Sequence, residues 1–302
     1  MLPPAIIERL VSFMWIADRW KDYEVLDCSG GEKLERWGDI VLRRPDPQVM
    51  WPIPNESGLW KNPHGHYHRS NRGGGQWEHK KKYPERWTIS YKNLKFNISP
   101  TGFKHTGLFP EQAANWDWAM DKIENAKRPI KVLNLFAYTG GATVACAAAG
   151  AEVCHVDASK GMVTWAKENL HTSGLGDRKV RFIVDDVVKF VEREIRRGNK
   201  YDAIIMDPPS YGRGPKGEVW QIEEKLYGLV ELCTKVLSDE PLFFLINSYT
   251  TGLSPIILEH ILDATVAKKA KGGKIYGGEI GIPTSRDGKV LPCGIFGRWE
   301  SK

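Results

Sequence analysis

The chain has 302 residues, of which 41% are hydrophobic and 26% are charged, and its formal net charge is +6. At roughly 150 residues per domain, this length accommodates about two domains, and the composition excludes a largely disordered chain. The longest apolar stretch near the start runs only from Leu10 to Ala17, which is too short for a membrane span or a signal peptide.

Residues 3–20 are predicted to form a helix, because two prolines lie near its start and apolar residues recur at helical spacing. These apolar residues are Ile6, Leu10, Phe13 and Met14. From residue 23 to residue 105, short β-type runs alternate with Gly- and Pro-rich breaks, which predicts a small β-rich domain with a long loop. The runs cover Tyr23–Asp27, Asp39–Arg43 and Trp87–Ile98.

Residues 61–104 contain ten Lys and Arg residues but only two acidic residues, Glu78 and Glu85. Five aromatic residues are interleaved with these cations: Trp60, Tyr67, Trp77, Tyr83 and Trp87. Cations that contact phosphates and aromatic rings that stack on bases are typical of single-stranded RNA binding. The expected RNA contacts are Lys80, Lys81, Lys82 and Arg86. The alternative is a solvated charge run whose aromatic residues form a small core.

Three histidines, His64, His66 and His68, alternate as metal ligands on a strand would, but Pro63 and Gly65 favour a loop. The five cysteines are widely scattered and include no C-x-x-C pair. Neither a zinc site nor a disulfide framework is therefore expected, and a reducing cytoplasm fits best. No bound metal is expected.

From Ile130 onward, five apolar strand-like runs alternate with helical patterns. They cover residues 130–136, 151–157, 179–184, 201–207 and 241–247. Such alternation indicates a mostly parallel sheet with helices on both faces. Two further β runs, 273–283 and 289–300, are joined by a turn without a helix, so they must pair antiparallel.

Residues that can bind ligands follow the first two runs. The chain breaks at Thr139, Gly140 and Gly141 before an Ala-rich helix, so backbone N–H groups can approach a ligand there. The alternative is a purely structural turn, and the dinucleotide fingerprint G-x-G-x-x-G is absent. Asp157 follows the second run, where such sheets hold ribose hydroxyls. A helix-capping role is the alternative, although Ser159 can serve as the cap.

Acidic residues also follow the third and fourth runs. Of Asp185 and Asp186, one is expected only to cap the next helix, and Asp186 is expected to bind an adenine amino group. In the sequence DPPSYGRG, which starts at Asp207, consecutive prolines hold the chain rigid and fix Asp207 at the strand end. Asp207 and a proline carbonyl can accept N–H bonds from a planar base while Tyr211 stacks on it. A Pro-rich exit from a buried strand is the alternative.

Residues from about 87 to 299 resemble the class I methyltransferases related to the 23S rRNA (cytosine-5-)-methyltransferases, which carry a similar DPP-x-aromatic loop and "VDAS…WAKEN" segment. The resemblance implies a Rossmann-like α/β sheet of five parallel strands plus a C-terminal antiparallel hairpin, here over residues 106–302. It also implies the cofactor S-adenosyl-L-methionine. The stretch from Phe103 to Gln112 resembles a segment that lies over the methionine end of the cofactor in relatives. The cofactor-binding residues implied are Thr106, Gly107, Phe109, Asn134, Phe136, Thr139, Gly140, Gly141, Asp157, Ala158, Asp186, Val187 and Asp207.

The resemblance further implies methyl transfer to a base in ribosomal or other RNA, with Asp207, Pro208 and Tyr211 as catalytic residues. Cytosine-5 methylation needs a cysteine thiolate, which relatives place after the fifth strand, but Asn247–Tyr249 contains none. Cys293, the only cysteine near the final hairpin, is an open alternative as the nucleophile. Without a thiolate, a base amino group or another nitrogen is the expected acceptor. The alternatives are a methyltransferase for a protein or small molecule and a non-catalytic RNA-binding protein. A homodimer is an open alternative to a monomer.

Overall fold

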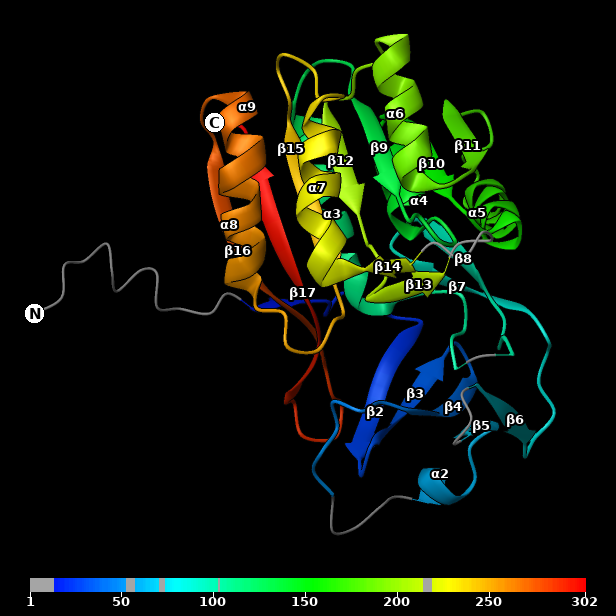
Figure 1. Cartoon of the computed structure of the whole chain (residues 1–302). Helices are drawn as coiled ribbons and strands as arrows, with labels where there is room; N and C mark the ends of the chain where they lie inside the picture. The colour runs from blue at the N-terminus through cyan, green and yellow to red at the C-terminus, as the bar shows by residue number, and fades with distance from the viewer. Residues whose placement is uncertain (1–13, 53–57, 71–73, 103, 214–218) are drawn as a thin grey trace, which may run out of the picture.

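The computed structural model describes residues 14–52, 58–70, 74–102, 104–213 and 219–302. An eight-stranded sheet flanked by helices lies above a separate five-stranded sheet in Figure 1. The strand order of the large sheet is β1-β16-β17-β15-β12-β9-β10-β11. The predicted α/β class, with a parallel core and a small β-rich part before it, is confirmed.

The parallel core of the large sheet contains all five predicted runs. They form β9 (Lys131–Leu135), β10 (Glu152–Asp157), β11 (Val180–Val184), β12 (Ala203–Met206) and β15 (Phe243–Ser248). The predicted terminal pair forms the antiparallel hairpin of β16 (Lys274–Pro283) and β17 (Val290–Glu300). β17 pairs antiparallel with β15, so the hairpin extends the sheet.

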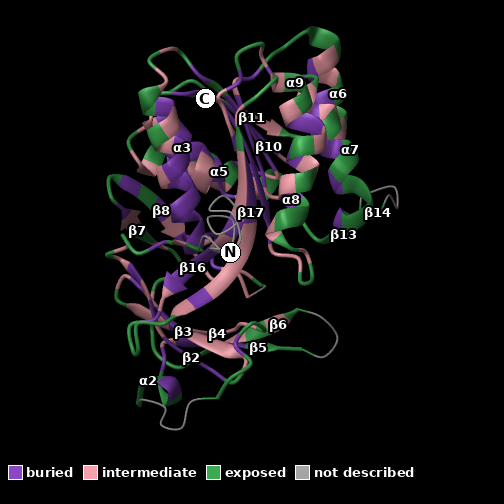
Figure 2. Cartoon of the chain, turned by 90° about the vertical axis from the view of Figure 1, so that its left-hand side faces the viewer, coloured by how far each residue is buried: buried purple, intermediate pink, exposed green. Residues whose placement is uncertain are grey.

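Helices cover both faces of this sheet because its strands are apolar on both sides. Successive residues of β9 show this, since Val132 packs into one core and Leu133 into the other. Figure 2 shows the buried strands enclosed between helices whose outer surfaces are exposed. One face carries α3 (Ala113–Asn125), α4 (Gly141–Ala148) and α5 (Lys160–Thr172). The other carries α6 (Val187–Arg197), α7 (Ile222–Thr234) and α8 (Pro255–Leu262), which continues through a π turn (Asp263–Ala267) into α9 (Lys268–Ala270).

The helix predicted over residues 3–20 is wrong where the structure describes that range. Residues 1–13 lie outside the described part, and Met14–Ile16 forms strand β1, which pairs parallel with β16. The exposed edge of the hairpin offers this segment backbone hydrogen bonds, and Trp15 packs edge-on against Phe296 at 6.1 Å. This tertiary pairing outweighs the helical spacing of the apolar residues.

The small sheet has the order β2-β3-β4-β5-β6. Its strands are β2 (Tyr23–Ser29), β3 (Glu32–Trp37), β4 (Ile40–Pro45), β5 (Gly65–Arg69) and β6 (Gly75–His79), and a short helix, α2 (Gly58–Lys61), lies between β4 and β5. The loop predicted around Gly65 is therefore wrong, because this segment pairs with both β4 and β6. The run Trp87–Ile98 forms a hairpin of β7 (Trp87–Tyr91) and β8 (Leu94–Ile98). This hairpin packs on α5, where Asn97 N donates to Asn169 Oδ1 at 2.8 Å.

Two of the aromatic residues interleaved with the basic segment are buried in cores, and two others are half-buried and bonded to the backbone. Trp60 and Tyr67 are buried, and the indole of Trp60 donates to Asp27 at 2.9 Å. Trp77 and Trp87 are half-buried and donate to the backbone oxygens of Thr101 and Trp37. A two-layer part with little helix needs large rings to fill its interior. The expectation that these rings stack on unpaired bases is wrong for the two buried residues.

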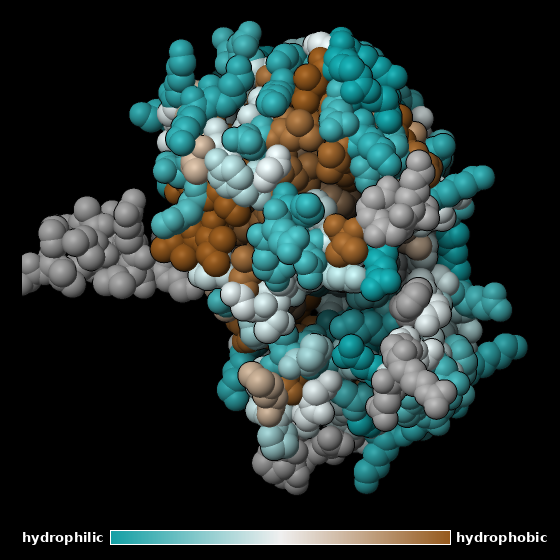
Figure 3. Space-filling model, in the orientation of Figure 1, coloured by the Kyte–Doolittle hydropathy of each residue, from teal (hydrophilic) through white to brown (hydrophobic). Residues whose placement is uncertain are grey.

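Apolar side chains also reach the surface over the helical face of the large sheet, as Figure 3 shows, whereas the surface of the small sheet is mostly hydrophilic in that view. Tyr227 of α7 and Ile256 and Ile257 of α8 are exposed there.

Candidate functional site

The chain turns sharply between β9 and α4. Phe136 and Tyr138 have φ angles of 54° and 50°, a left-handed conformation that costs non-glycine residues on the order of 1–3 kcal/mol each. Such residues gather at ligand-binding sites, where the surrounding structure holds them. Here Tyr138 N donates to Asp157 Oδ2 at 2.9 Å, which ties the turn to the end of β10. Phe136 is among the predicted cofactor-binding residues, whereas sequence reasoning missed Tyr138.

Helix packing dictates the two glycines of the turn. Gly140 has φ 82°, and a Cβ atom there would lie 2.9 Å from Cβ of Ala166 in α5. A Cβ atom on Gly141 would lie 2.5 Å from the ring of Trp116 in α3. Close packing against α3 and α5 is therefore enough to explain why both positions are glycine. The absence of side chains there also leaves the start of the helix open to a ligand.

The predicted segment before α3 lies against the same turn. Thr139 Oγ1 donates to Gly107 O, and Thr139 O accepts a 2.8 Å bond from Asn169 Nδ2. Thr106 is buried, and its hydroxyl has no hydrogen-bond partner among the described residues. The segment continues into a single 3₁₀ turn, Pro110–Gln112.

One pocket opens at the carboxyl ends of β9, β12 and β15, the edge where open α/β sheets bind ligands. Six predicted residues line it together: Phe109, Asn134, Phe136, Thr139, Gly141 and Asp207. Sequence reasoning missed several others that also line it: Leu108, Gln112, Trp116, Ala137, Tyr138, Ala142 and Ile205. Leu108, Gln112 and Trp116 come from helix α3 and its approach, whereas Ala137 and Tyr138 lie between β9 and α4, Ala142 lies in α4 and Ile205 lies in β12. Asn247, noted in the sequence only for its lack of a thiol, completes the lining.

Asn134 is fixed by a buried polar chain. Its Nδ2 donates to Thr143 Oγ1 at 2.9 Å, and that hydroxyl lies 2.9 Å from Nδ1 of His155. Burial lowers the pKa of His155 to about 3, so the imidazole is neutral. These hydrogen bonds tie Asn134, which lines the pocket, to Thr143 of α4 and His155 of β10.

The remaining predicted residues lie outside this pocket lining. Asp157 is half-buried at the end of β10, where its Oδ1 accepts a 2.8 Å bond from Ser159 N. Ser159 caps α5, as expected. Ala158 is exposed, and Val187 is buried in the core beneath α6.

The expected division of roles between Asp185 and Asp186 is wrong. Asp186 caps α6, because its Oδ1 accepts a 2.9 Å bond from Lys189 N. Asp185 instead pairs with Arg193. The residue next to the helix has the extended backbone that an N-cap needs, so the cap falls on the second aspartate.

The DPP loop is held rigidly. The Trp220 indole donates to Pro209 O at 2.6 Å and packs on Phe136 with ring centroids 5.6 Å apart. Tyr211 begins the short hairpin of β13 (Tyr211–Arg213) and β14 (Val219–Gln221), and its side chain is exposed. The bonded carbonyl belongs to Pro209, so the role predicted for Pro208 stays a prediction, and Trp220 is a residue that the motif did not reveal.

Asp207 titrates in an unusual range. Burial, together with the nearby Glu111 carboxylate, raises the pKa of Asp207 to about 7. Burial also raises the pKa of Glu111 above its ordinary value. Asp207 thus lines a site where a carboxylate is poorly solvated, so a cation or an N–H donor bound there stabilises its ionised form.

Buried amides connect the pocket to the terminal hairpin. Asn115 Nδ2 donates to Asn247 Oδ1 at 2.8 Å and to Gln112 Oε1 at 2.9 Å, and Gln112 Nε2 donates to the Tyr249 hydroxyl at 2.7 Å. Arg298 in turn donates to Asn115 Oδ1. The Arg298 guanidinium is buried and lies 3.9 Å from the Trp15 ring centroid, and burial lowers its pKa to about 10.

All five cysteines belong to the described part of the chain, and all are free thiols. Burial raises the pKa of Cys293 well above its ordinary value, and its Sγ donates to Leu291 O at 3.4 Å. Burial raises the pKa of the other four as well. None offers a thiolate at neutral pH.

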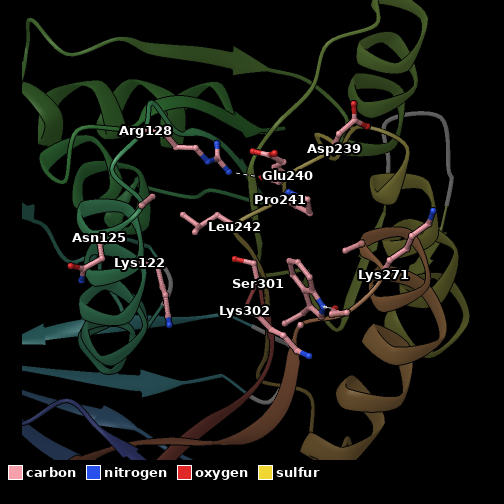
Figure 4. Close-up of a pocket in the computed structure, with 15 residues that line it drawn as sticks. Lys122, Asn125, Arg128, Asp239, Glu240, Pro241, Leu242, Lys271, Ser301 and Lys302 are labelled. Atoms are coloured by element: carbon pink, nitrogen blue, oxygen red, sulfur yellow. Dashed lines mark hydrogen bonds between the residues drawn. The ribbon is translucent and has the colours of Figure 1, made fainter.

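A polar groove opens at the opposite edge of the sheet (Figure 4), where Leu242 precedes β15. Arg128 donates to Glu240 O across it, at 2.5 Å. Its lining comes from the ends of α3, α9 and β17 and from the segment before β15, at the edge opposite to the one where open α/β sheets bind ligands.

Within the described ranges, no helix is long and apolar enough to cross a membrane.

A family model described as S-adenosylmethionine-dependent methyltransferase matches residues 65–259. A crystal structure of a SAM-dependent methyltransferase from Agrobacterium tumefaciens is 37% identical, with a TM-score of 0.89, and the match covers 97% of this chain and 94% of that one. A structure from Streptococcus mutans is 19% identical, with a TM-score of 0.69, and covers 93% and 76% of the two chains, which shows a shared fold.

Two sequence relatives carry ribosomal names. Ribosomal RNA large subunit methyltransferase K/L from Shewanella frigidimarina is 30% identical over 71% of this chain. Ribosomal RNA large subunit methyltransferase K from Neisseria meningitidis is 27% identical over 66% of this chain. The matches span 30% and 56% of the lengths of these relatives.

Proposed function

The chain belongs to the S-adenosylmethionine-dependent methyltransferase family, and from that membership we propose that it methylates a nitrogen atom of a base in ribosomal or other RNA. The observation that carries the proposal is Asp207, a carboxyl group with a pKa of about 7 on a rigid loop at the pocket. The names of the two ribosomal relatives support RNA as the acceptor. Such a substrate would place the reaction in the cytoplasm.

The residues present fit S-adenosylmethionine. Its sulfonium and ammonium groups are cations, and the pocket offers Asp207 with Glu111 close by, both with raised pKa values. The Asp157 carboxylate at the end of β10 would accept hydrogen bonds from ribose hydroxyls, the role that carboxylates at this position of such sheets have. The hydroxyl of Thr106 is buried without a partner in the described residues, so it is a further candidate donor to the cofactor. When bound, the cofactor supplies an electrophilic methyl group.

This chain's own residues position the acceptor. Asp207 accepts an N–H bond from the base and takes the proton that the nitrogen loses on methylation, for which a pKa near 7 is well matched. Trp220 keeps the loop in place through Pro209. Phe109 lies 5.5 Å from both Tyr138 and Tyr249, ring centre to ring centre, and this aromatic wall excludes water. Positioning of this kind can supply roughly 7–11 kcal/mol of the barrier reduction.

A nitrogen acceptor fits the pocket better than carbon-5 of cytosine. Carbon-5 needs covalent activation by a thiolate, and burial holds Cys293, like the other cysteines, in the thiol form. At the position where relatives carry such a cysteine, β15 ends in Asn247 and Ser248, both buried.

The basic segment after β6 supplies the proposed RNA contacts. Lys81 and Lys82 are exposed and able to reach phosphates. Lys80 donates to Lys61 O at 3.3 Å, and Arg86 pairs with Glu168 and lies 5.3 Å from the Trp165 ring. These two cations are partly engaged in packing, so Lys81 and Lys82 carry most of the expected phosphate contact.

The proposal is tested with radiolabelled cofactor and large-subunit ribosomal RNA from a strain that lacks the gene. Mass spectrometry of the digested RNA should show a single N-methylated nucleoside that the strain itself lacks. Label found in protein or small molecules and not in RNA would sink the RNA proposal. Appearance of 5-methylcytidine would instead overturn the choice of nitrogen. Cofactor binding without any methyl transfer would favour a non-catalytic RNA-binding protein.

A further inference from the structure

Three residues of the small sheet bring together donor atoms of the kind that bind transition metals. His66 and His68 lie on β5 and Glu78 lies on β6, and one ligand atom from each lies within 4.8 Å of the others. Alternation along a strand puts His66 and His68 on the same face. The register of the hairpin places Glu78 directly opposite His66. The two imidazole rings have centroids only 3.9 Å apart.

Carboxylates already orient both imidazoles. His66 Nε2 lies 2.7 Å from Glu32 Oε1, and His68 Nε2 lies 2.9 Å from Glu78 Oε2. Glu32 is itself held, because Arg43 Nε donates to its other oxygen at 2.8 Å. A carboxylate that accepts the ring N–H of a metal-bound histidine fixes its tautomer and orientation. Glu32 is placed to play this supporting part for His66.

The third alternating histidine is separate from the cluster. His64 Nδ1 accepts a 3.0 Å hydrogen bond from Val41 N, so this imidazole is bonded to the backbone of β4. The side chains of His68 and Glu78 are 48% and 49% exposed, so an ion can reach them from solvent and water can complete its coordination. Two imidazoles, a carboxylate and water form a donor set that suits Zn²⁺.

We propose that His66, His68 and Glu78 bind one divalent transition-metal ion of the zinc class. The ion links β5 to β6, which is the edge strand of the small sheet and pairs only with β5 among the described strands. The site lies on a different sheet from the methyl-transfer pocket and shares no residue with its lining. Metal binding there is therefore independent of the proposed methyl transfer.

The test uses the untagged full chain, stripped of metal with a chelator and titrated with zinc chloride in a calorimeter. We expect one ion per chain, and zinc should raise the midpoint of thermal unfolding because it binds the folded state. His68→Ala and Glu78→Gln should each weaken binding by more than about tenfold, and Glu32→Gln, which removes the orienting carboxylate, by about 10- to 100-fold. Cofactor binding should be unchanged in all three variants.

His79→Ala is the matched control, because His79 is an exposed histidine on the same strand but on the opposite face from Glu78. It should bind zinc as the unmodified chain does. The absence of saturable binding would overturn the proposal and leave only a hydrogen-bonded surface cluster. Binding that His68→Ala and Glu78→Gln do not change would equally overturn it, because the ion would then lie elsewhere. Both side chains are half-exposed, so their replacement should not prevent folding, which circular dichroism checks.

Discussion

The two sheets of this protein use charged residues in opposite ways. The parallel core of the large sheet has mostly apolar strands and places Asp157 at the end of β10 and Asp207 just beyond β12, where Asp207 lines the pocket. The small sheet places charge inside itself: Glu35 of β3 is buried and accepts bonds of 2.6 and 2.8 Å from Arg44 of β4. We expect the strand-end carboxylates of the large sheet to serve ligand binding and the buried Glu35–Arg44 pair to serve stability. Substitutions in each region should therefore affect different measurements.

The largest effect is expected from Asp207→Asn. If this carboxylate accepts the proton of the acceptor nitrogen, methyl transfer should fall by about 10²- to 10⁴-fold. The thermal unfolding midpoint should stay nearly unchanged. In the unmodified chain, the rate should rise with pH through about 7, because the pKa of Asp207 is raised to about 7 and only its carboxylate is active. The variant should lose this rise.

Asp239→Asn is the control for this change, since Asp239 is an exposed aspartate at the opposite groove in Figure 4. It should leave rate and pH profile alone. A rate for Asp207→Asn within about twofold of the unmodified chain would remove Asp207 from the mechanism.

Glu35→Gln should produce the largest loss of stability. It leaves the buried Arg44 guanidinium without its counter-charge, and breaking such a pair typically costs about 3–5 kcal/mol of unfolding free energy. Urea unfolding should measure it. Glu24→Gln is the matched control, because its pair with Arg36 is partly exposed and such pairs contribute about 0–1 kcal/mol. Equal losses for the two variants would contradict the idea that charge within this sheet is structural.

The residues behind these two predictions differ in how well their positions could be predicted from the sequence. Asp157 and Asp207 were recognisable because the carboxyl ends of parallel strands share one edge, so a local pattern is enough to bring them together. The Glu35–Arg44 pair and the Trp60 and Tyr67 core depend on which antiparallel strands pair and in which register, and no local pattern reveals this. Likewise, Asn115 bonds the pocket residue Asn247 from 132 positions away in the chain, which no local pattern reveals. The mistaken helix at Met14–Ile16 and loop at Gly65 have the same cause, namely pairing with distant strands.

Asp157→Ala should have an intermediate effect, on cofactor affinity, and it tests whether a carboxylate at a strand end of the large sheet binds the ligand. Loss of hydrogen bonds to a charged group costs about 1.5–3 kcal/mol, so cofactor affinity should fall by about 10- to 100-fold in calorimetry. Asp177→Ala, at an exposed position in the turn after α5, should leave affinity unchanged. Unchanged affinity for Asp157→Ala would show that the carboxylate only supports Tyr138 and Ser159.

The smallest effect is expected from charge reversal at Lys81 and Lys82, which are exposed and belong to neither sheet interior. Removing two phosphate contacts should reduce the slope of log affinity against log salt for single-stranded RNA by about 1.4. Reversal of Lys268 and Lys269 on α9 is the control, and its salt slope should match that of the unmodified chain. An identical slope for both double variants would move RNA binding away from this segment.

Strand β1 has a consequence for biosynthesis. Met14 pairs with Glu279, about 265 residues later in the chain, and Trp15 covers the buried guanidinium of Arg298. At translation rates of roughly 5–20 residues per second, this early segment waits on the order of tens of seconds for its partner. The small sheet, whose strands lie within residues 23–79, can form in the meantime. The edge of the large sheet therefore closes late, and a chain interrupted before β16 would leave the β1 segment without its strand partner.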